Sequence, residues 1–170
     1  MKELKRRLCS ELSCVNMVFL SILAGACVLL GILFAISGVS GFIYWHTFQP
    51  KFGLPPFFMV LFWIIAYALF GACIAVALSA PRCQSQAARK RIAILAACAL
   101  ILCYVWIPVV YKAASFFLAT LLAAVIVLCL AVLYSMLRRV SRLASFGILV
   151  FAVWMLYILC YTLALFLLNG

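Results

Sequence analysis

The sequence predicts an all-α integral membrane protein, a bundle of five transmembrane helices, on the strength of three observations. The chain of 170 residues is 72% hydrophobic and 9% charged, with a mean hydropathy of +1.39, and a soluble domain of this size cannot bury so many apolar side chains. It contains five apolar runs of about 20 residues, the length that crosses a bilayer. The segments that precede and connect these runs are alternately rich and poor in basic residues. We therefore expect one membrane domain over residues 1–170, with no appreciable soluble part.

The first expected span covers residues 15–42 and follows a basic N-terminal segment. Its apolar run is too long for the core of a signal peptide, so we expect it to stay attached as a helix. Small residues recur in it at four-residue spacing, as in Cys27, Gly31 and Ala35. Such spacing lets two helix backbones approach closely in lipid, and we interpret these residues as a packing face.

The first substantial polar interruption, residues 40–54, separates the first two spans. Tyr44 and Trp45 within it are amphipathic rings of the kind that anchor at the membrane–water interface. His46 is the only histidine, and no carboxylate or second histidine lies near it in the sequence. We therefore interpret His46 as an interfacial polar residue without a chemical role.

The second expected span, residues 55–80, holds the strongest local pattern of the chain. It opens with a proline pair that begins at Pro55, and proline suits a helix start because the missing N–H costs nothing there. Trp63, Tyr67 and Gly71 follow at four-residue spacing, so they lie on one stripe of the helix. We expect two amphipathic rings and then a place where a neighbouring helix approaches.

Three further spans are expected over residues 92–110, 113–137 and 143–168. A cationic loop, residues 82–91, precedes the first of these three. Pro108 should bend or finish that same helix, because proline removes a backbone donor from the helix interior. The remaining connections are short, so consecutive spans should be antiparallel neighbours.

The basic residues predict the orientation in the membrane. Five crossings place the N-terminal segment, the 82–91 loop and the turn 138–142 on one side, with 11 of the 13 basic residues, and leave Lys51 and Lys112 on the other. By the positive-inside rule the N-terminus is cytoplasmic and the C-terminus exoplasmic. The loop charges then meet membrane lipid; nucleic acid is excluded as a partner because a soluble basic surface is lacking.

Acid–base and metal chemistry lack the residues that they need. Glu3 and Glu11 are the only acidic residues, and both precede the first span. None of the nine cysteines forms a C-x-x-C pair, and most lie in apolar runs, where cysteine behaves as a small hydrophobe. We expect no catalytic residue, no metal site and no required cofactor. Ion-coupled transport is also disfavoured, because no ionisable Asp, Glu, Lys, Arg or His falls at membrane depth.

Motifs spread over most of the chain resemble those of the TspO/MBR family, the tryptophan-rich sensory proteins related to the translocator protein or peripheral benzodiazepine receptor. Matches to the family pattern before and within the second span are Tyr44, Pro50, Pro55, Trp63, Tyr67 and Gly71. In the third span Trp106, Pro108 and Tyr111 match, while Cys103 stands where the family has asparagine.

The fifth span shows both matches and departures. Ala144, Trp154 and Asn169 fit the family pattern. Phe151 stands at a tyrosine position, and Ile158 replaces a small residue. The resemblance is thus to a divergent member, and Ile158 should narrow the family's pocket.

The resemblance implies a ligand pocket within a five-helix bundle, roofed by the loop between the first two helices. Members are similar in binding porphyrins and other hydrophobic ligands, with sterols in the animal branch, and many form homodimers. A porphyrin or haem-like ligand, or a sterol or lipid, is the implied partner. Carried over by position, the ligand-binding residues are Tyr44, Pro55, Trp63, Tyr67, Cys103, Trp106, Phe151, Trp154 and Ile158.

The residues alone agree on the kind of ligand. Trp63, Trp106 and Trp154 come from three helices at membrane depth, and together they could line a flat apolar cavity. The alternative is that each tryptophan is ordinary packing or part of an interfacial belt. Small pairs such as Ala93 with Ala97, or Ala119 with Ala123, are candidate faces for a homodimer.

Three functions follow from this reading. The favoured one is a membrane receptor or carrier for a planar tetrapyrrole such as a porphyrin. The second is light-dependent porphyrin breakdown, which would use indole and excited pigment rather than acid–base groups. The third is a membrane scaffold or a passive transporter of lipid-like molecules.

Overall fold

The computed structural model describes residues 16–38, 46–80 and 85–169. These residues form helices and connections, with no strand among them, which confirms the all-α fold class. All five helices are long and apolar enough to cross a membrane. They are α2 (Met17–Gly38), α4 (Pro56–Ser79), α5 (Gln86–Tyr111), α6 (Phe116–Leu137) and α7 (Arg142–Asn169).

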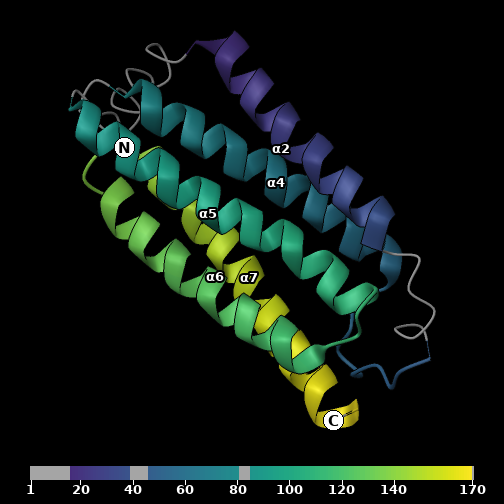
Figure 1. Ribbon diagram of the computed structural model, residues 1–170. Helices are drawn as coiled ribbons and strands as arrows, with labels where there is room; N and C mark the ends of the chain where they lie inside the picture. The colour runs from purple at the N-terminus through teal and green to yellow at the C-terminus, as the bar shows by residue number, and fades with distance from the viewer. Residues whose placement is uncertain (1–15, 39–45, 81–84, 170) are drawn as a thin grey trace, which may run out of the picture.

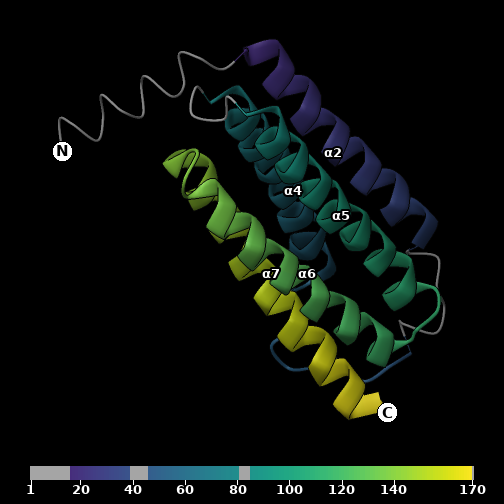
Figure 2. The ribbon, with the colours of Figure 1, turned by 60° about the vertical axis from the view of Figure 1, so that its left-hand side comes forward.

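The axes of the five described helices lie roughly parallel (Figure 1), and the contacts between the helices close them into a ring. Each helix packs against two neighbours in the order α2, α4, α7, α6, α5 and back to α2, with a weaker contact of α4 with α5 across the ring. Helix α2 lies at the outer edge of the bundle (Figure 2). Only 11% of the residues in the most apolar stretch of α2 are buried inside the protein, compared with 56% for α4. Helix α2 is therefore the least buried of the five described helices.

Glycines set the spacing of α2 against α4. A Cβ on Gly71 would lie 2.7 Å from the Ala24 Cα, so the two backbones touch where Gly71 has no side chain. This confirms the expected approach of a neighbouring helix at Gly71. The Tyr104 hydroxyl of α5 donates a 2.7 Å hydrogen bond to the Cys27 carbonyl, which fixes α2 from its other side.

The third span begins earlier than the sequence suggested. Residues 86–91, expected in a cationic loop, form the first turns of α5 behind Ser85 at the N-cap. The segment contains no Gly or Pro and consists of strong helix formers, whose propensity outweighs the small cost of basic side chains at a helix N-terminus. Residues 39–42, the end of the first expected span, lie outside the described residues.

Helix α5 continues past Pro108 to Tyr111. The Pro108 carbonyl accepts hydrogen bonds from the backbone N–H groups of Lys112 and Ala113, at 2.9 and 3.0 Å. Ala114, with a φ of 48°, then reverses the chain into α6. Proline therefore precedes the helix end by one turn and does not itself stop the helix.

The prediction that Ala119 and Ala123 form a homodimer face is wrong. Ala119 and Ala123 are fully buried between α6 and its neighbours in the same chain, so they are not available to a second copy. Ala93 and Ala97 of α5 are exposed and keep that possibility.

Candidate ligand-binding cavity

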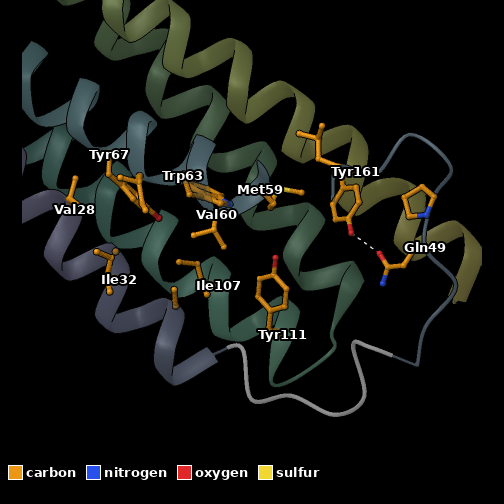
Figure 3. Close-up of a pocket in the computed structure, with 16 residues that line it drawn as sticks. Val28, Ile32, Gln49, Met59, Val60, Trp63, Tyr67, Ile107, Tyr111 and Tyr161 are labelled. Atoms are coloured by element: carbon orange, nitrogen blue, oxygen red, sulfur yellow. Dashed lines mark hydrogen bonds between the residues drawn. The ribbon is translucent and has the colours of Figure 1, made fainter. Parts of the chain in front are cut away.

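A cavity of about 250 Å³ lies between α2, α4, α5 and the loop 46–54, near the end of α7 (Figure 3). Helix α4 supplies the largest share of its wall. The residues that line it are Val28, Gly31, Ile32, Ala35, Gln49, Pro50, Gly53, Leu54, Met59, Val60, Trp63, Ile64, Tyr67, Ile107, Tyr111 and Tyr161. The wall is therefore mainly apolar, with a few phenol, indole and amide groups.

Gly31 determines how α2 closes the cavity. A Cβ at this position would lie 2.6 Å from two ring carbons of Tyr67, so the Tyr67 ring occupies the space that any larger residue would need. The spacing of Cys27, Gly31 and Ala35 predicts a packing face, and Gly31 does pack against Tyr67 of α4. Gly31 and Ala35 also line the cavity, a role that this spacing does not reveal.

Trp63 and Tyr67 form the flat part of the wall. Their rings stack with centroids 5.2 Å apart and an interplanar angle of 25°. Trp63 is 8% exposed and Tyr67 3%, so both rings are held in place by packing on their far sides. A flat apolar molecule in the cavity would meet two rigid aromatic surfaces.

Several polar atoms of this region are buried without a partner. No described residue accepts a hydrogen bond from Trp63 Nε1, Trp106 Nε1 or Trp154 Nε1, or pairs with the Tyr67 hydroxyl. Leaving such a group unpaired costs about 1–3 kcal/mol, so each one calls for an explanation. Trp63 and Tyr67 belong to the cavity wall, but both polar atoms are fully buried with the cavity empty, so a bound molecule can supply the missing acceptor only after the neighbouring side chains shift.

The loop 46–54 covers one end of the cavity and is tied to α7. The Phe48 N–H donates a 2.8 Å bond to Asn169 Oδ1, and Asn169 Nδ2 donates a 3.0 Å bond back to the Phe48 carbonyl. The Tyr161 hydroxyl donates a 2.6 Å bond to Gln49 Oε1, and this bond lies at the edge of the cavity (Figure 3). Asn169 fits the family pattern and here holds the loop.

A second tie lies one helical turn before Tyr161. The Leu54 N–H donates a 3.2 Å bond to the Tyr157 hydroxyl, which in turn donates a 3.4 Å bond to the Phe52 carbonyl. Within the loop, the Gly53 N–H donates a 2.9 Å bond to the Pro50 carbonyl and closes a tight turn. The roof is thus shaped by one turn and positioned by side chains of α7.

Only some of the residues predicted to bind a ligand line the cavity. Trp63 and Tyr67 line the cavity. Trp106 and Trp154 lie behind them, with ring centroids 5.5 and 5.9 Å from Trp63. The three tryptophans therefore form one cluster, of which only Trp63 reaches the cavity wall.

The other predicted residues lie elsewhere. Cys103, Phe151 and Ile158 are buried in the core and do not line the cavity, and the Phe151 ring packs on Phe70 at 5.1 Å. Pro55 is exposed next to the lining residue Leu54. Tyr44 lies outside the described residues. Ile158 faces the core, so it does not narrow this cavity.

The α2 wall, Gln49 and Tyr161 were missed as cavity residues. Helix α2 is apolar on every side, so its sequence does not indicate which side faces inward. Tyr161 shares a helix face with Trp154, and this shared face is the pattern in the sequence that could have identified Tyr161 as a cavity residue. Within the described ranges no three His, Cys, Asp or Glu residues gather as metal ligands.

Comparison with known proteins agrees with the fold and the motifs. The sequence model of the TspO/MBR family matches residues 13–168, almost the whole chain. A comparison with curated proteins finds no match. The chain is a multi-pass integral membrane protein that belongs to the TspO/MBR family.

Proposed function

We propose that this protein is a membrane receptor or carrier that binds a planar hydrophobic ligand in the cavity beside α4. The observation that carries the proposal is the pair formed by Trp63 and Tyr67. Their stacked rings offer a flat apolar surface, and Trp63 Nε1 and the Tyr67 hydroxyl have no partner among the described residues. A ligand with a flat body and a hydrogen-bond acceptor at its edge satisfies both features.

The volume of the cavity limits the size of the ligand that can bind without rearrangement of the protein. Cavities that hold drug-sized molecules measure about 300–1,000 Å³, and this one measures about 250 Å³. A flat ligand of a few fused rings fits without rearrangement. A porphyrin, which the family resemblance favours, is larger, and its entry requires the loop 46–54 to move outward.

Ligand titration of the purified protein tests the proposal. We expect a small polycyclic aromatic ketone to quench tryptophan fluorescence, and protoporphyrin to do so more slowly. Tyr67→Phe removes one hydrogen bond and should weaken ketone binding about 2- to 10-fold. Tyr134→Phe on α6, outside the cavity lining, is the matched control. Absence of quenching, or quenching that is unchanged by Trp63→Phe combined with Trp154→Phe, counts against the proposal.

A second candidate function is light-dependent breakdown of a bound pigment, and the tryptophan cluster favours it. Trp63 contacts Trp106 and Trp154, and the Trp154 ring stacks on Tyr157 at 5.3 Å. An excited pigment against Trp63 can take an electron from the indole, and neighbouring rings can share the resulting hole. Loss of porphyrin absorbance in light but not in darkness, abolished by Trp63→Phe, is the expected signature.

A further inference from the structure

The tryptophan and tyrosine rings form one continuous network of contacts. The network contains every described tryptophan and every described tyrosine except Tyr134. At its centre is Trp63, whose ring contacts those of Tyr67, Trp106 and Trp154. Indole and phenol are the aromatic side chains that give up an electron most readily, so the network joins the rings that can be oxidised.

One arm of this network runs from Trp63 along α7 toward the loop 46–54. The Trp154 ring meets the Trp63 ring edge-on, with centroids 5.9 Å apart. The Tyr157 ring stacks on Trp154 at 5.3 Å and 26°, and the Tyr161 ring stacks on Tyr157 at 6.2 Å and 23°. Trp154, Tyr157 and Tyr161 follow one another at three- and four-residue spacing, so they lie on one face of α7. The arm therefore leads from the buried tryptophans to the side chains that hold the loop.

The inner rings of the network have no neighbour that could take a proton from them. An indole that has lost an electron becomes neutral only when its N–H proton passes to an acceptor. No described residue accepts a hydrogen bond from Nε1 of Trp63, Trp106 or Trp154, or pairs with the Tyr67 hydroxyl. The sequence also has no Asp or Glu after Glu11 to balance a buried positive charge. Positive charge on an inner ring is therefore unfavourable, and electron transfer from an outer ring relieves it.

The outer end of the arm has the polar surroundings that the inner rings lack. Tyr157 is half-buried, and its hydroxyl donates a 3.4 Å bond to the carbonyl of Phe52, an exposed residue of the loop. The Tyr161 hydroxyl donates a 2.6 Å bond to Gln49 Oε1 (Figure 3). At neutral pH a phenol that can release its proton is easier to oxidise than an indole. Oxidation that begins on the tryptophans should therefore come to rest on Tyr157, the more exposed of the two tyrosines.

We propose that the network is a relay that carries oxidation from the buried tryptophans to Tyr157 beside the loop. A one-electron oxidant, such as a photoexcited dye, takes an electron from Trp63. An electron from Trp154 restores Trp63, and an electron from Tyr157 restores Trp154. Tyr157 releases its phenol proton to water at the loop and becomes a neutral radical, and a soluble hydrogen-atom donor of the ascorbate class returns the electron and the proton. The relay goes beyond the proposed function and does not depend on which ligand the cavity binds.

Photo-ionisation of the protein without a ligand tests the relay. The starting protein carries Trp45→Phe, so that Trp63, Trp106 and Trp154 are its only indoles. Light that excites indole is given to this protein in nanodiscs, and a soluble cobalt(III) ammine complex takes up the electron that the excited ring ejects. We expect the tryptophan radical to decay while a tyrosyl radical grows, as measured by transient absorption and by electron paramagnetic resonance of frozen samples. Added ascorbate should then shorten the life of the tyrosyl radical.

Two variants interrupt the arm at different points. Tyr157→Phe removes the final electron donor and should lower the tyrosyl yield severalfold, measured relative to the tryptophan radical formed first. Trp154→Phe interrupts the ring contacts between Trp63 and Tyr157. It should lower the yield in the same way, and it keeps the Tyr157 hydroxyl and its bonds to the loop. A loss in both variants therefore reports the arm itself and not the position of the loop.

Tyr134→Phe on α6 is the matched control, because Tyr134 lies outside the network. Its ring faces Arg138, whose guanidinium carbon lies 5.7 Å from the ring centroid. This variant should give the same tyrosyl yield as the starting protein. A tryptophan radical that decays without forming a tyrosyl radical, or equal tyrosyl yields in all three variants, overturns the relay. Either result leaves the proposed function standing, because no ligand takes part in the experiment.

Discussion

Trp63 and Gly31 determine the shape of the cavity at the level of single residues. Trp63 contacts the rings of Tyr67, Trp106 and Trp154, so it is the point where the wall and the tryptophan cluster meet. Gly31 lies directly against the Tyr67 ring. A change at either position moves the Tyr67 ring and with it the wall that faces a ligand.

A single methyl group at Gly31 should therefore disturb the protein. In Gly31→Ala the new Cβ would lie 2.6 Å from the Tyr67 ring, so the ring or α2 must shift. We expect a loss of about 1–3 kcal/mol in the free energy of unfolding, as for other overpacked sites, and weaker ligand binding. Thermal unfolding in detergent and the fluorescence titration measure the two effects.

Gly25→Ala on the same helix is the control for this change. A Cβ at Gly25 meets no atom within 4 Å. Alanine also has the higher helix propensity, by about 1 kcal/mol, so this variant should be as stable as the parent or slightly more so. Equal melting temperatures of the two alanine variants would contradict the role assigned to Gly31.

Helix α7 acts at the level of elements, because its side chains hold the loop that covers the cavity. Tyr157, Tyr161 and Asn169 provide these ties, and each meets a residue more than 100 positions away in the chain. Within the loop, the backbone closes one tight turn, from the Gly53 N–H to the Pro50 carbonyl. The position of the roof thus depends on α7.

Releasing the roof should change the rates of ligand exchange. Tyr161→Phe combined with Asn169→Ala removes hydrogen bonds that each contribute about 0.5–1.5 kcal/mol, so the loop should open more often. We expect association and dissociation of a small aromatic ligand to accelerate by about tenfold together, with little change in Kd. Stopped-flow fluorescence measures both rates, and Tyr134→Phe serves as the control. Unchanged rates, or acceleration of dissociation alone, would argue against the loop as the route of entry.

The sequence predicted the elements far better than their inward faces. Hydrophobic length alone fixed the five spans, and proline identified the start of α4. The helices are apolar all round, so periodicity does not distinguish a residue that faces lipid from one that faces the cavity. Carry-over from the family supplied Tyr67, and for Trp63 it agreed with the pattern of tryptophans in the sequence. Cys103, Phe151 and Ile158 do not line this cavity because they are buried in the core, where the Phe151 ring packs on Phe70 of α4.

At the level of the whole molecule, charge distinguishes the two ends of the bundle. The start of α5 and the α6–α7 turn hold the described arginines, while Lys51 and Lys112 lie at the cavity end. The positive-inside rule then predicts that the arginine end is cytoplasmic and that the cavity opens toward the exoplasmic side.

Reporter fusions in a bacterial host test this orientation. Alkaline phosphatase joined after Asn169 should be active, because the positive-inside rule predicts that this end is exoplasmic, and a green fluorescent protein joined there should stay dark. Fusions after Arg139, in the α6–α7 turn, should give the opposite pattern. Activity of the phosphatase at both positions would contradict the predicted topology.

The shallow attachment of α2 links the cavity to the surrounding bilayer. Helix α2 forms one wall of the cavity, and only 11% of the residues in its most apolar stretch are buried in the protein. In a membrane, acyl chains would therefore contact much of this helix. A membrane whose thickness does not match the length of a helix changes the tilt of that helix, and a tilt of α2 moves Gly31 relative to Tyr67. We therefore expect lipid composition to change the shape of the binding site, so that one ligand binds with different strength in thin and thick membranes.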